Sequence, residues 1–313
     1  MGSGVAEYVE KRILVVVKTY PNPSSKYTET VCCAGVDLET GGWVRLYPIT
    51  FRLLADRQFD KFQEIRCKVA RRPADTRPES WKVDQDTIEL IGNRMPAGPH
   101  GWAKRMTLLP PASPSLDAIK DAQARDGTSL GMFRPKEIVG LTKRQADPWT
   151  EREKAHLRQQ LLALGADVSR ELNELEQIPW KFGYEFRCDD DHCRGHDLSI
   201  IDWEIGAAYR NWRRDYGEEW EVKLRQKFEQ ELPATDLHLV VGNLAAHHGS
   251  FVIIGLVRPP RPKVHGGYVQ ETLDLMRQER SVAGIGVGLE AQEANTLGAE
   301  ERNETLELFP DEA

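Results

Sequence analysis

The 313-residue sequence has no apolar stretch long enough to cross a membrane. Its longest uninterrupted apolar run, Ile13 to Val17, is far shorter than the roughly 20 residues that a membrane-spanning helix needs. The N-terminal residues, MGSGVAEYVEKR, mix acids and bases and lack the apolar core of a secretion signal. We therefore expect a soluble, cytoplasmic protein with no membrane partner.

Cysteine is scarce, and its count is odd. The five cysteines do not suggest a disulfide framework, which is typical of short secreted chains with paired cysteines. Cys32 and Cys33 are adjacent within an apolar run, which favours two reduced core residues. The cysteine content therefore agrees with a reducing compartment.

The sequence also lacks the strong basic excess that many nucleic-acid-binding proteins have. Its formal charge is −7, but residues 264–313 hold 11 acids and 3 arginines, so the first 263 residues are close to neutral. Binding of nucleic acid would thus depend on a local basic surface. The acidic tail, 264–313, is expected to be mobile and available to a basic protein partner.

Short strand-like segments separated by turns make up the first part of the chain. They are predicted at 13–20, 29–37, 43–47 and 62–70, and Gly41-Gly42 forms a hairpin turn. Several short strands with turn signals suggest a small curled sheet or barrel. We therefore predict a β-rich, barrel-like N-terminal half over residues 11–95 that recognises nucleic acid.

A Pro- and Gly-rich stretch separates this half from the rest of the chain. Residues 96–165 are interpreted as a connector with helices, and residues 166–263 as a mixed α/β half, with a domain boundary near residue 165. Further strands are predicted at 136–141, 180–188, 237–241 and 251–257, and helices at 116–124, 148–164, 200–216 and 218–232. The expected fold class is α/β (α+β).

The sharpest chemical signal lies at residues 188–196, Cys-Asp-Asp-Asp-His-Cys-Arg-Gly-His. Thiolate and imidazole are the preferred ligands of Zn²⁺, which takes four ligands in a tetrahedron. Cys188, Cys193 and His196 are close enough in sequence for one loop to wrap a single ion, and Gly195 permits a tight turn. We therefore predict a zinc site, structural rather than catalytic because the loop is compact.

The sequence does not identify the fourth ligand of this site. His192, which we include in the predicted set, Cys67, His247, His248, an acid or water would each satisfy the chemistry. A site closed by four protein ligands would be structural, whereas an open position would make it catalytic. The spacing differs from the paired pattern of zinc ribbons, so two ordinary cysteines and a loop-capping His196 are the alternative.

Two carboxylates follow directly after the cluster. On a strand, Asp202 and Glu204 would project from one face, where they could hold Mg²⁺ for phosphodiester cleavage or assist cleavage of a glycosidic bond. On a helix, Asp202 would instead cap the first turn, Glu204 would favour the positive end of the helix dipole, and the two side chains would diverge. We take both residues as catalytic candidates.

Basic and aromatic residues that would suit nucleic acid gather beside a rigid Pro-turn in the first half and on the helix after Asp202. The predicted nucleic-acid-binding residues are Lys18, Tyr20, Lys26, Arg45, Arg52, Arg71, Arg72, Arg77, Arg210 and Arg214. The alternatives are a solvated surface, a purely structural turn, and arginines that extend over core aromatics.

Four segments resemble an uncharacterised bacterial family associated with mobile and phage-defence genes. They are KTYPNPSSKYTETVCCAG (18–35), WVRLYPITFR (43–52), CDDDHCRGHDLSIIDWE (188–204) and GSFVIIGLVRPP (249–260), and together they span most of residues 13–260. The resemblance implies a DNA-acting effector of bacterial defence that senses or removes modified bases. The resemblance does not identify any catalytic residue in this chain.

These observations predict a DNA-acting hydrolase of phage defence. It would break the bond between base and sugar, as a DNA glycosylase does, or cleave a phosphodiester bond as a nuclease, with Mg²⁺ as a further cofactor. Glycosidic cleavage is favoured because it needs a carboxylate but no second metal, and acids are few near residue 202. The alternative is a non-catalytic, zinc-stabilised reader of nucleic acid or an interaction module.

Overall fold

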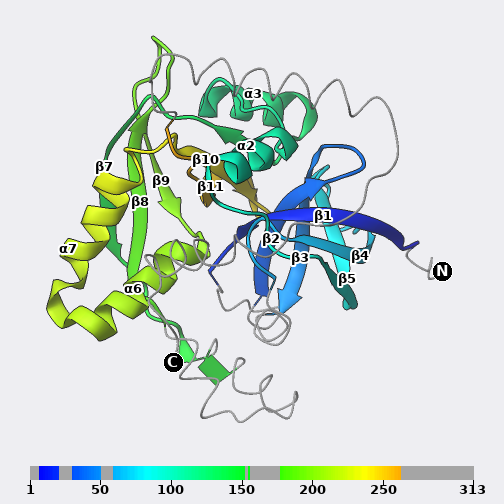
Figure 1. Cartoon of the computed structure of the whole chain (residues 1–313), viewed down its shortest axis with the longest axis horizontal. Coiled ribbons are helices and arrows are strands. Elements are labelled where there is room, and N and C mark those ends of the chain that lie inside the picture. Colours follow the sequence, from blue (N-terminus) through cyan, green and yellow to red (C-terminus); the bar gives the residue numbers. More distant parts are fainter. Residues whose placement is uncertain (1–6, 21–29, 51–58, 152–153, 156–176, 262–313) are drawn as a thin grey trace.

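The computed structural model describes residues 7–20, 30–50, 59–151, 154–155 and 177–261. Two β-sheets and a few helices make up this part of the chain, with the first sheet on the right of Figure 1 and the second, with its helices, toward the left. The predicted mixed α/β architecture is confirmed. Lys26, Arg52, most of the helix predicted at 148–164 and the acidic tail lie outside the described residues. No helix among those described is both long and apolar enough to span a bilayer.

Five strands form the first sheet. They are β1 (Val9–Lys18), β2 (Thr30–Asp37), β3 (Trp43–Thr50), β4 (Glu64–Ala70) and β5 (Ser80–Ile91). Each strand pairs with two others, in the order β1-β2-β3-β5-β4 and back to β1 through the β1–β4 pair, so the sheet closes on itself. The β3–β5 pair is parallel, and the other pairs are antiparallel.

Strand β1 is apolar without interruption because both of its faces are buried. Ile13 and Val15 belong to the core inside the closed sheet, whereas Leu14, Val16 and Val17 pack outward in a core shared with the second sheet. The two sheets approach closely here: a Cβ on Gly255 of the second sheet would lie 2.6 Å from Val17 Cγ2. The continuous apolar run therefore marks a strand between two cores, as expected for a strand buried on both sides.

The second sheet has six strands in the order β6-β10-β11-β9-β8-β7. Their bounds are β6 (Leu130–Phe133), β7 (Glu137–Gln145), β8 (Trp180–Arg187), β9 (His196–Ile200), β10 (His238–Leu244) and β11 (His247–Val257). Strands β6 and β7 precede residue 165, yet they pair with β10 and β8. The second sheet thus extends across the predicted boundary near that residue.

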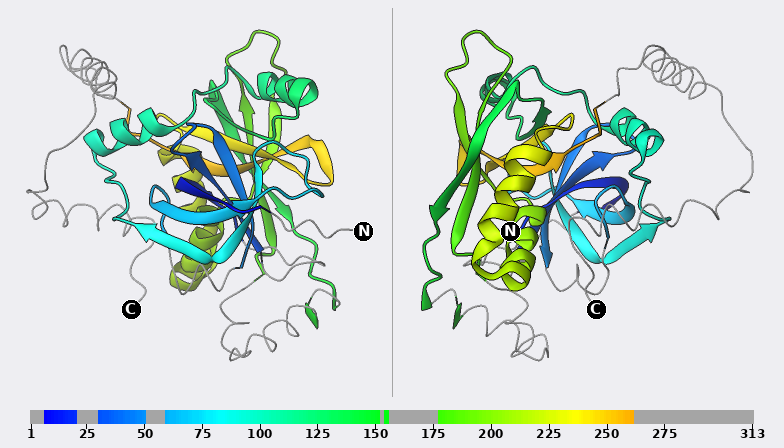
Figure 2. Two further views of the ribbon diagram at one scale, coloured as in Figure 1. Left: turned by 90° about the vertical axis from the view of Figure 1, so that its right-hand side faces the viewer. Right: turned by 60° about the vertical axis from the view of Figure 1, so that its left-hand side comes forward.

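Helices cover the second sheet and the junction between the sheets (Figures 1 and 2). They are α2 (Pro99–Leu108), α3 (Leu116–Asp126), α6 (Trp203–Tyr216), the 3₁₀ turn η1 (Gly217–Glu219), α7 (Trp220–Arg225) and the π-helical η2 (Gln226–Glu231). Tyr209 of α6 and Trp220 of α7 pack edge to face at 4.8 Å, and both rings contact Phe182 of β8. This aromatic cluster fixes α6 on the sheet and thereby positions its N-terminus.

Two arginines join the closed sheet to the second sheet. Arg45 donates to the carbonyl oxygens of Asn243 and Ser129 at 3.0 and 2.9 Å, and Arg77 donates to the same Asn243 oxygen at 3.0 Å. Arg45 is 5% exposed and Arg77 is 6% exposed. Because their guanidinium groups are buried and hydrogen-bonded to backbone carbonyls, we withdraw both residues from the predicted nucleic-acid-binding set.

Asp75 positions Arg77 at this contact between the two sheets by accepting hydrogen bonds of 2.7 and 2.8 Å from its guanidinium group. Burial alone would raise the pKa of Asp75, but the hydrogen bonds and charge of Arg77 lower it from 3.8 to about 2. A lowered pKa stabilises the fold above the unfolded value near 4, and this stabilisation is lost as the pH falls toward 2. We therefore expect Asp75→Asn to cost about 2 kcal/mol at pH 7 and almost nothing near pH 2.

Urea unfolding of both proteins between pH 2.5 and 7 measures this difference. Asp86→Asn, at an exposed position of β5, is the matched control and should leave stability unchanged at every pH. A cost for Asp75→Asn that is the same at both ends of the pH range would contradict the assignment.

Candidate functional site

The predicted metal cluster forms at the hairpin between β8 and β9. Cys188 directly follows β8, His196 opens β9, and Gly195 turns the chain with a φ of +93°. The ligand atoms of Cys188, Cys193 and His196 all lie within 4.8 Å of one another. The predicted grouping of these three residues is confirmed, and together they can hold a metal ion.

The surroundings of the cluster suit metal ligands. The Leu116 N–H donates to Cys188 Sγ at 3.5 Å, and the Cys188 N–H donates to Cys193 Sγ at 3.2 Å. Burial raises the pKa of the Cys188 thiol to about 11 and lowers the pKa of His196. The lowered pKa keeps His196 neutral, which is the form that binds metals, whereas Cys188 must release its proton to solvent when it binds the ion.

The structure separates the other proposed ligands from this cluster. The His192 side chain is 98% exposed, so its place in the predicted metal set is not supported. Cys67 lies in the core of the first sheet, and His247 and His248 are exposed at the start of β11. The nearest additional ligand type is the carboxylate of Asp117 on α3, 3.4 Å from His196 Nε2.

Asp202 is completely buried and caps α6, as one of the two interpretations of the sequence predicted. Its side chain accepts hydrogen bonds from the Glu204 N–H at 3.0 Å, the Leu256 N–H at 2.9 Å and Lys61 Nζ at 2.7 Å. Complete burial raises the pKa of Asp202, and the charge of Lys61 opposes this rise. Asp202 thus links α6, β11 and the first sheet at one point.

Glu204 shares Lys61 with Asp202 but reaches solvent. Its carboxylate lies 3.1 Å from Lys61 Nζ, and its side chain is 17% exposed. Burial alone would raise the pKa of Glu204, but the nearby charges of Lys61, Arg258 and Arg94 outweigh this effect and lower it. Glu204 is therefore an ionised, partly accessible carboxylate among cations.

Lys61 was not among the predicted site residues, although it pairs with both Asp202 and Glu204. It lies 141 positions before Asp202, and no local pattern relates the two residues. The next residue, Phe62, has a φ of +62°, an unfavourable conformation for a bulky side chain. The Phe62 N–H donates to the Val15 carbonyl at 2.6 Å, which ties this bend to β1.

Lys18, a predicted binding residue, approaches the same site from β1. Its Nζ donates to the Phe59 carbonyl at 2.9 Å and lies 5.5 Å from the centre of the Phe59 ring. Burial lowers the pKa of Lys18, and the charge of Lys61 acts in the same direction. Lys61, Asp202 and Glu204 thus meet where the first sheet adjoins the N-terminus of α6, and the charges of Lys18, Arg94 and Arg258 act on this group.

Aromatic rings and an arginine lie beside these charges. Tyr20 stacks on Trp203 with ring centres 5.5 Å apart and an interplanar angle of 24°. The Arg210 guanidinium lies 5.7 Å from the Tyr20 ring and 5.4 Å from the Trp203 ring. A Cβ at Gly206 would lie 2.3 Å from the Tyr20 ring, so only glycine permits this contact. We call Lys18, Tyr20, Lys61, Trp203, Glu204 and Arg210 the seam site.

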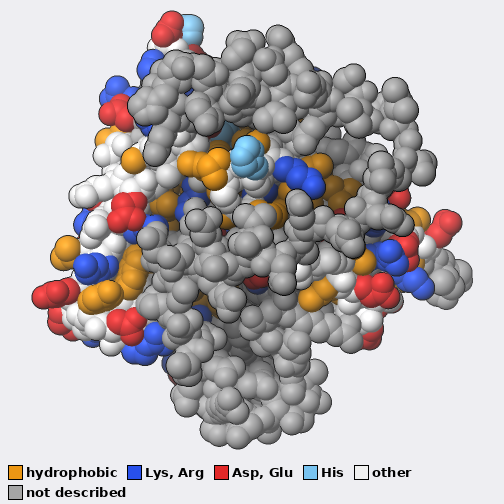
Figure 3. Space-filling model, in the orientation of Figure 1, with side chains coloured by type: hydrophobic (Ala, Val, Ile, Leu, Met, Phe, Trp, Pro, Cys, Tyr) orange, Lys and Arg blue, Asp and Glu red, His pale blue; other side chains and the backbone are white. Residues whose placement is uncertain are grey.

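The remaining predicted basic residues lie elsewhere. Arg71 stacks on Trp81 at 3.7 Å, and Arg72 follows it in the β4–β5 loop. Arg214 is exposed on α6 and pairs with Asp215 at 2.9 Å. Among the described side chains visible in Figure 3, acidic and basic groups are interspersed rather than gathered by sign.

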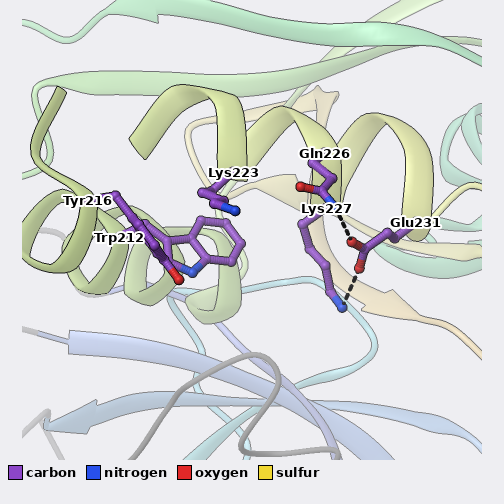
Figure 4. A pocket seen from close by; sticks show the side chains of 6 residues that line it. All are labelled: Trp212, Tyr216, Lys223, Gln226, Lys227 and Glu231. Atoms are coloured by element: carbon purple, nitrogen blue, oxygen red, sulfur yellow. Dashed lines mark hydrogen bonds and ion pairs between the residues drawn. The ribbon is translucent and has the colours of Figure 1, made fainter. Parts of the chain in front are cut away.

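A hollow of about 280 Å³ lies between α6 and α7, away from the seam site. It is lined by Trp212, Tyr216, Lys223, Gln226, Lys227 and Glu231 (Figure 4). Lys227 pairs with Glu231 at 2.9 Å, and the Lys223 ammonium lies 5.2 Å from the Tyr216 ring. Its polar groups therefore largely satisfy one another.

Two family models match the chain in succession. Residues 112–278, more than half of the chain, match the family described as Domain of unknown function (DUF8757), and the chain belongs to this family. Residues 9–111 match the family described as Domain of unknown function (DUF8758). The two matches meet just before α3, within the predicted connector, and separate the first sheet from the second. A comparison with curated proteins gave no match.

Proposed function

We propose that the protein binds DNA at the seam site and hydrolyses a base–sugar bond there. The observation that carries the proposal is Glu204, an ionised and partly exposed carboxylate held by Lys61 and directly following Trp203 of the Tyr20–Trp203 stack in α6. Bases released from a duplex stack on aromatic side chains of the enzymes that cleave or modify them. Cations around Glu204 would attract the phosphates on either side of the base.

Glycosidic hydrolysis matches the charges of the seam site. Water adds to the sugar carbon, the base leaves with the bonding electrons and takes up a proton, and the water gives up a proton. Glu204, ionised because its pKa is lowered, would stabilise the positive charge on the sugar and accept the proton of the water. Lys61 keeps this carboxylate ionised.

Phosphodiester cleavage with Mg²⁺ is less favoured at this position. Such reactions use carboxylates that are free to bind cations. Lys61 Nζ lies between Asp202 and Glu204, at 2.7 and 3.1 Å, and so takes the place that a divalent ion would need. The pair therefore fits chemistry that does not pass through a metal ion.

The pairing of the first five strands supports a nucleic-acid-binding role. A closed set of five strands with β3 parallel to β5 resembles the oligonucleotide-binding barrel, which uses strands 2 and 3 and the loops between strands 1–2 and 4–5. Here Ala34 and Val36 of β2 pack against the second sheet. The ligand would therefore approach the end of β1, where Tyr20 lies. Because fold alone does not define function, the proposal depends on the seam site.

We further propose that Cys188, Cys193 and His196 hold a structural Zn²⁺. Two thiolates and one imidazole are a preferred zinc donor set, and the cluster closes a hairpin rather than lining the seam site. The ion would supply no chemistry to the reaction. It would hold β8 and β9 in register next to Asp202 and α6.

Incubation of the full chain with modified and unmodified DNA, single- and double-stranded, tests the proposed reaction. We expect strand breaks only after mild alkali, because base removal leaves an alkali-labile abasic site. Glu204→Gln should lower product formation about 100-fold or more. Glu218→Gln, at an 88% exposed position just beyond α6, is the matched control and should retain full activity.

Each other outcome identifies a different function. Nicks that require Mg²⁺ would indicate a nuclease, and DNA binding without product would indicate a reader. The complete burial of Asp202 as a helix cap specifically favours this second candidate, since it removes one of the two proposed catalytic carboxylates from contact with a ligand. The link to phage defence rests on the sequence resemblance alone and stays a prediction.

A further inference from the structure

His196 carries a buried ring nitrogen without a hydrogen-bond partner. Its Nε2 atom is inaccessible to solvent, yet it makes no hydrogen bond. The atom that faces it is a carboxylate oxygen of Asp117, 3.4 Å away. A buried nitrogen without a hydrogen bond costs free energy, so we expect this atom to bind a partner.

The distance between these two atoms fits a shared metal ion. Hydrogen bonds between nitrogen and oxygen span about 2.7–3.2 Å, so 3.4 Å is long for a direct bond. Two ligands at about 2.0–2.2 Å from one tetrahedral Zn²⁺ lie about 3.3–3.5 Å apart. The observed separation therefore agrees with that expected for two ligands of one tetrahedral ion.

The first turn of α3 is also fixed against the cluster by a second contact. Leu116, the residue before Asp117, donates its N–H to Cys188 Sγ at 3.5 Å, and Ser115 caps the helix. Figure 1 shows α3 beside the end of the sheet where β8 and β9 meet. Asp117 thus projects from a fixed helix start that already touches one ligand.

We propose that Asp117 is the fourth protein ligand and that the metal ion joins α3 to the β8–β9 hairpin. Asp117 is not among the three residues whose ligand atoms all lie within 4.8 Å of one another, so a shared ion requires its carboxylate to come closer to the sulfur atoms. Lys120, which contacts the other Asp117 oxygen at 2.9 Å, offsets the net negative charge of two thiolates and a carboxylate around Zn²⁺. The site is closed and structural. This inference rests on the proposed zinc site.

Metal titration of the full chain tests the assignment. In competition with a chromophoric chelator, Asp117→Asn should bind Zn²⁺ about 100-fold more weakly than the wild type. This is at least as large as the loss of affinity seen when a residue that only contacts a metal ligand is replaced. Asp121→Asn, an exposed acid on the same helix, is the matched control and should bind as the wild type does. Loading with Co²⁺ then reports whether a coordination position is open.

Azide added to the Co²⁺ form should change the visible spectrum of Asp117→Asn but not that of the wild type, because only the variant has a position for it. An azide response in the wild type, or equal zinc affinity in the Asp117 and Asp121 variants, would overturn the assignment. Absence of zinc binding by the wild type would instead overturn the zinc site itself. The two failures are therefore distinguishable.

Discussion

Asp202→Ala should destabilise the protein by roughly 3–5 kcal/mol, because it breaks a buried ion pair and leaves two backbone N–H groups without their acceptor. In the variant, Lys61 would keep only Glu204 as a partner, while the N–H groups of Glu204 and Leu256 would lose their acceptor. Loss of the α6 cap adds about 1 kcal/mol within this range. Urea unfolding at pH 7 measures the change directly.

A double-mutant cycle separates the ion pair from the cap. Asp202→Asn keeps a capping side chain but removes the charge, so it should cost less than Asp202→Ala. Lys61→Met should be strongly destabilising alone, and the Lys61→Met/Asp202→Asn double variant should be less destabilised than the sum of the single variants. A cost below about 1 kcal/mol for Asp202→Ala would show that the contacts around Asp202 do not stabilise the fold.

Cys193→Ser should abolish stoichiometric metal binding and lower the free energy of unfolding by about 4 kcal/mol in zinc at 1,000 times its Kd. The serine hydroxyl does not ionise at neutral pH and is a poor zinc ligand, so the variant keeps only one thiolate, Cys188, and cannot hold the ion tightly. Elemental analysis of the purified protein gives the occupancy, and thermal unfolding with and without chelator gives the stability.

His192→Ala provides the control for this prediction. The His192 side chain is 98% exposed, so its removal should change neither zinc content nor thermal stability. Full zinc occupancy in Cys193→Ser would exclude the cluster as the metal site. Loss of zinc from His192→Ala would mean that the loop rearranges around the ion.

Local patterns were sufficient where neighbours in sequence are also neighbours in space. The apolar run of β1 and the alternation of β8 predicted strands, and three ligands within nine residues predicted the metal cluster. Strand β5 was missed because its mixed, charged sequence has few inward-facing apolar residues. Helix α2 was missed within a Pro- and Gly-rich stretch, although Pro99 at its first position is a recognised helix start.

Local sequence patterns were enough to predict β1 to β4, β7, β8, β10 and β11, the helix after Asp202 and the metal-ligating hairpin, because each depends on residues a few positions apart. The short strands β6 and β9, like β5, were not predicted. Local patterns could not predict that Lys61 pairs with Asp202, that buried Arg45 hydrogen-bonds to the second sheet or that Asp117 faces His196. These contacts join residues 79 to 198 positions apart, and their energies arise from burial and from charges brought together by chain folding. A single sequence records which charges exist, but the packing of two sheets decides which of them meet.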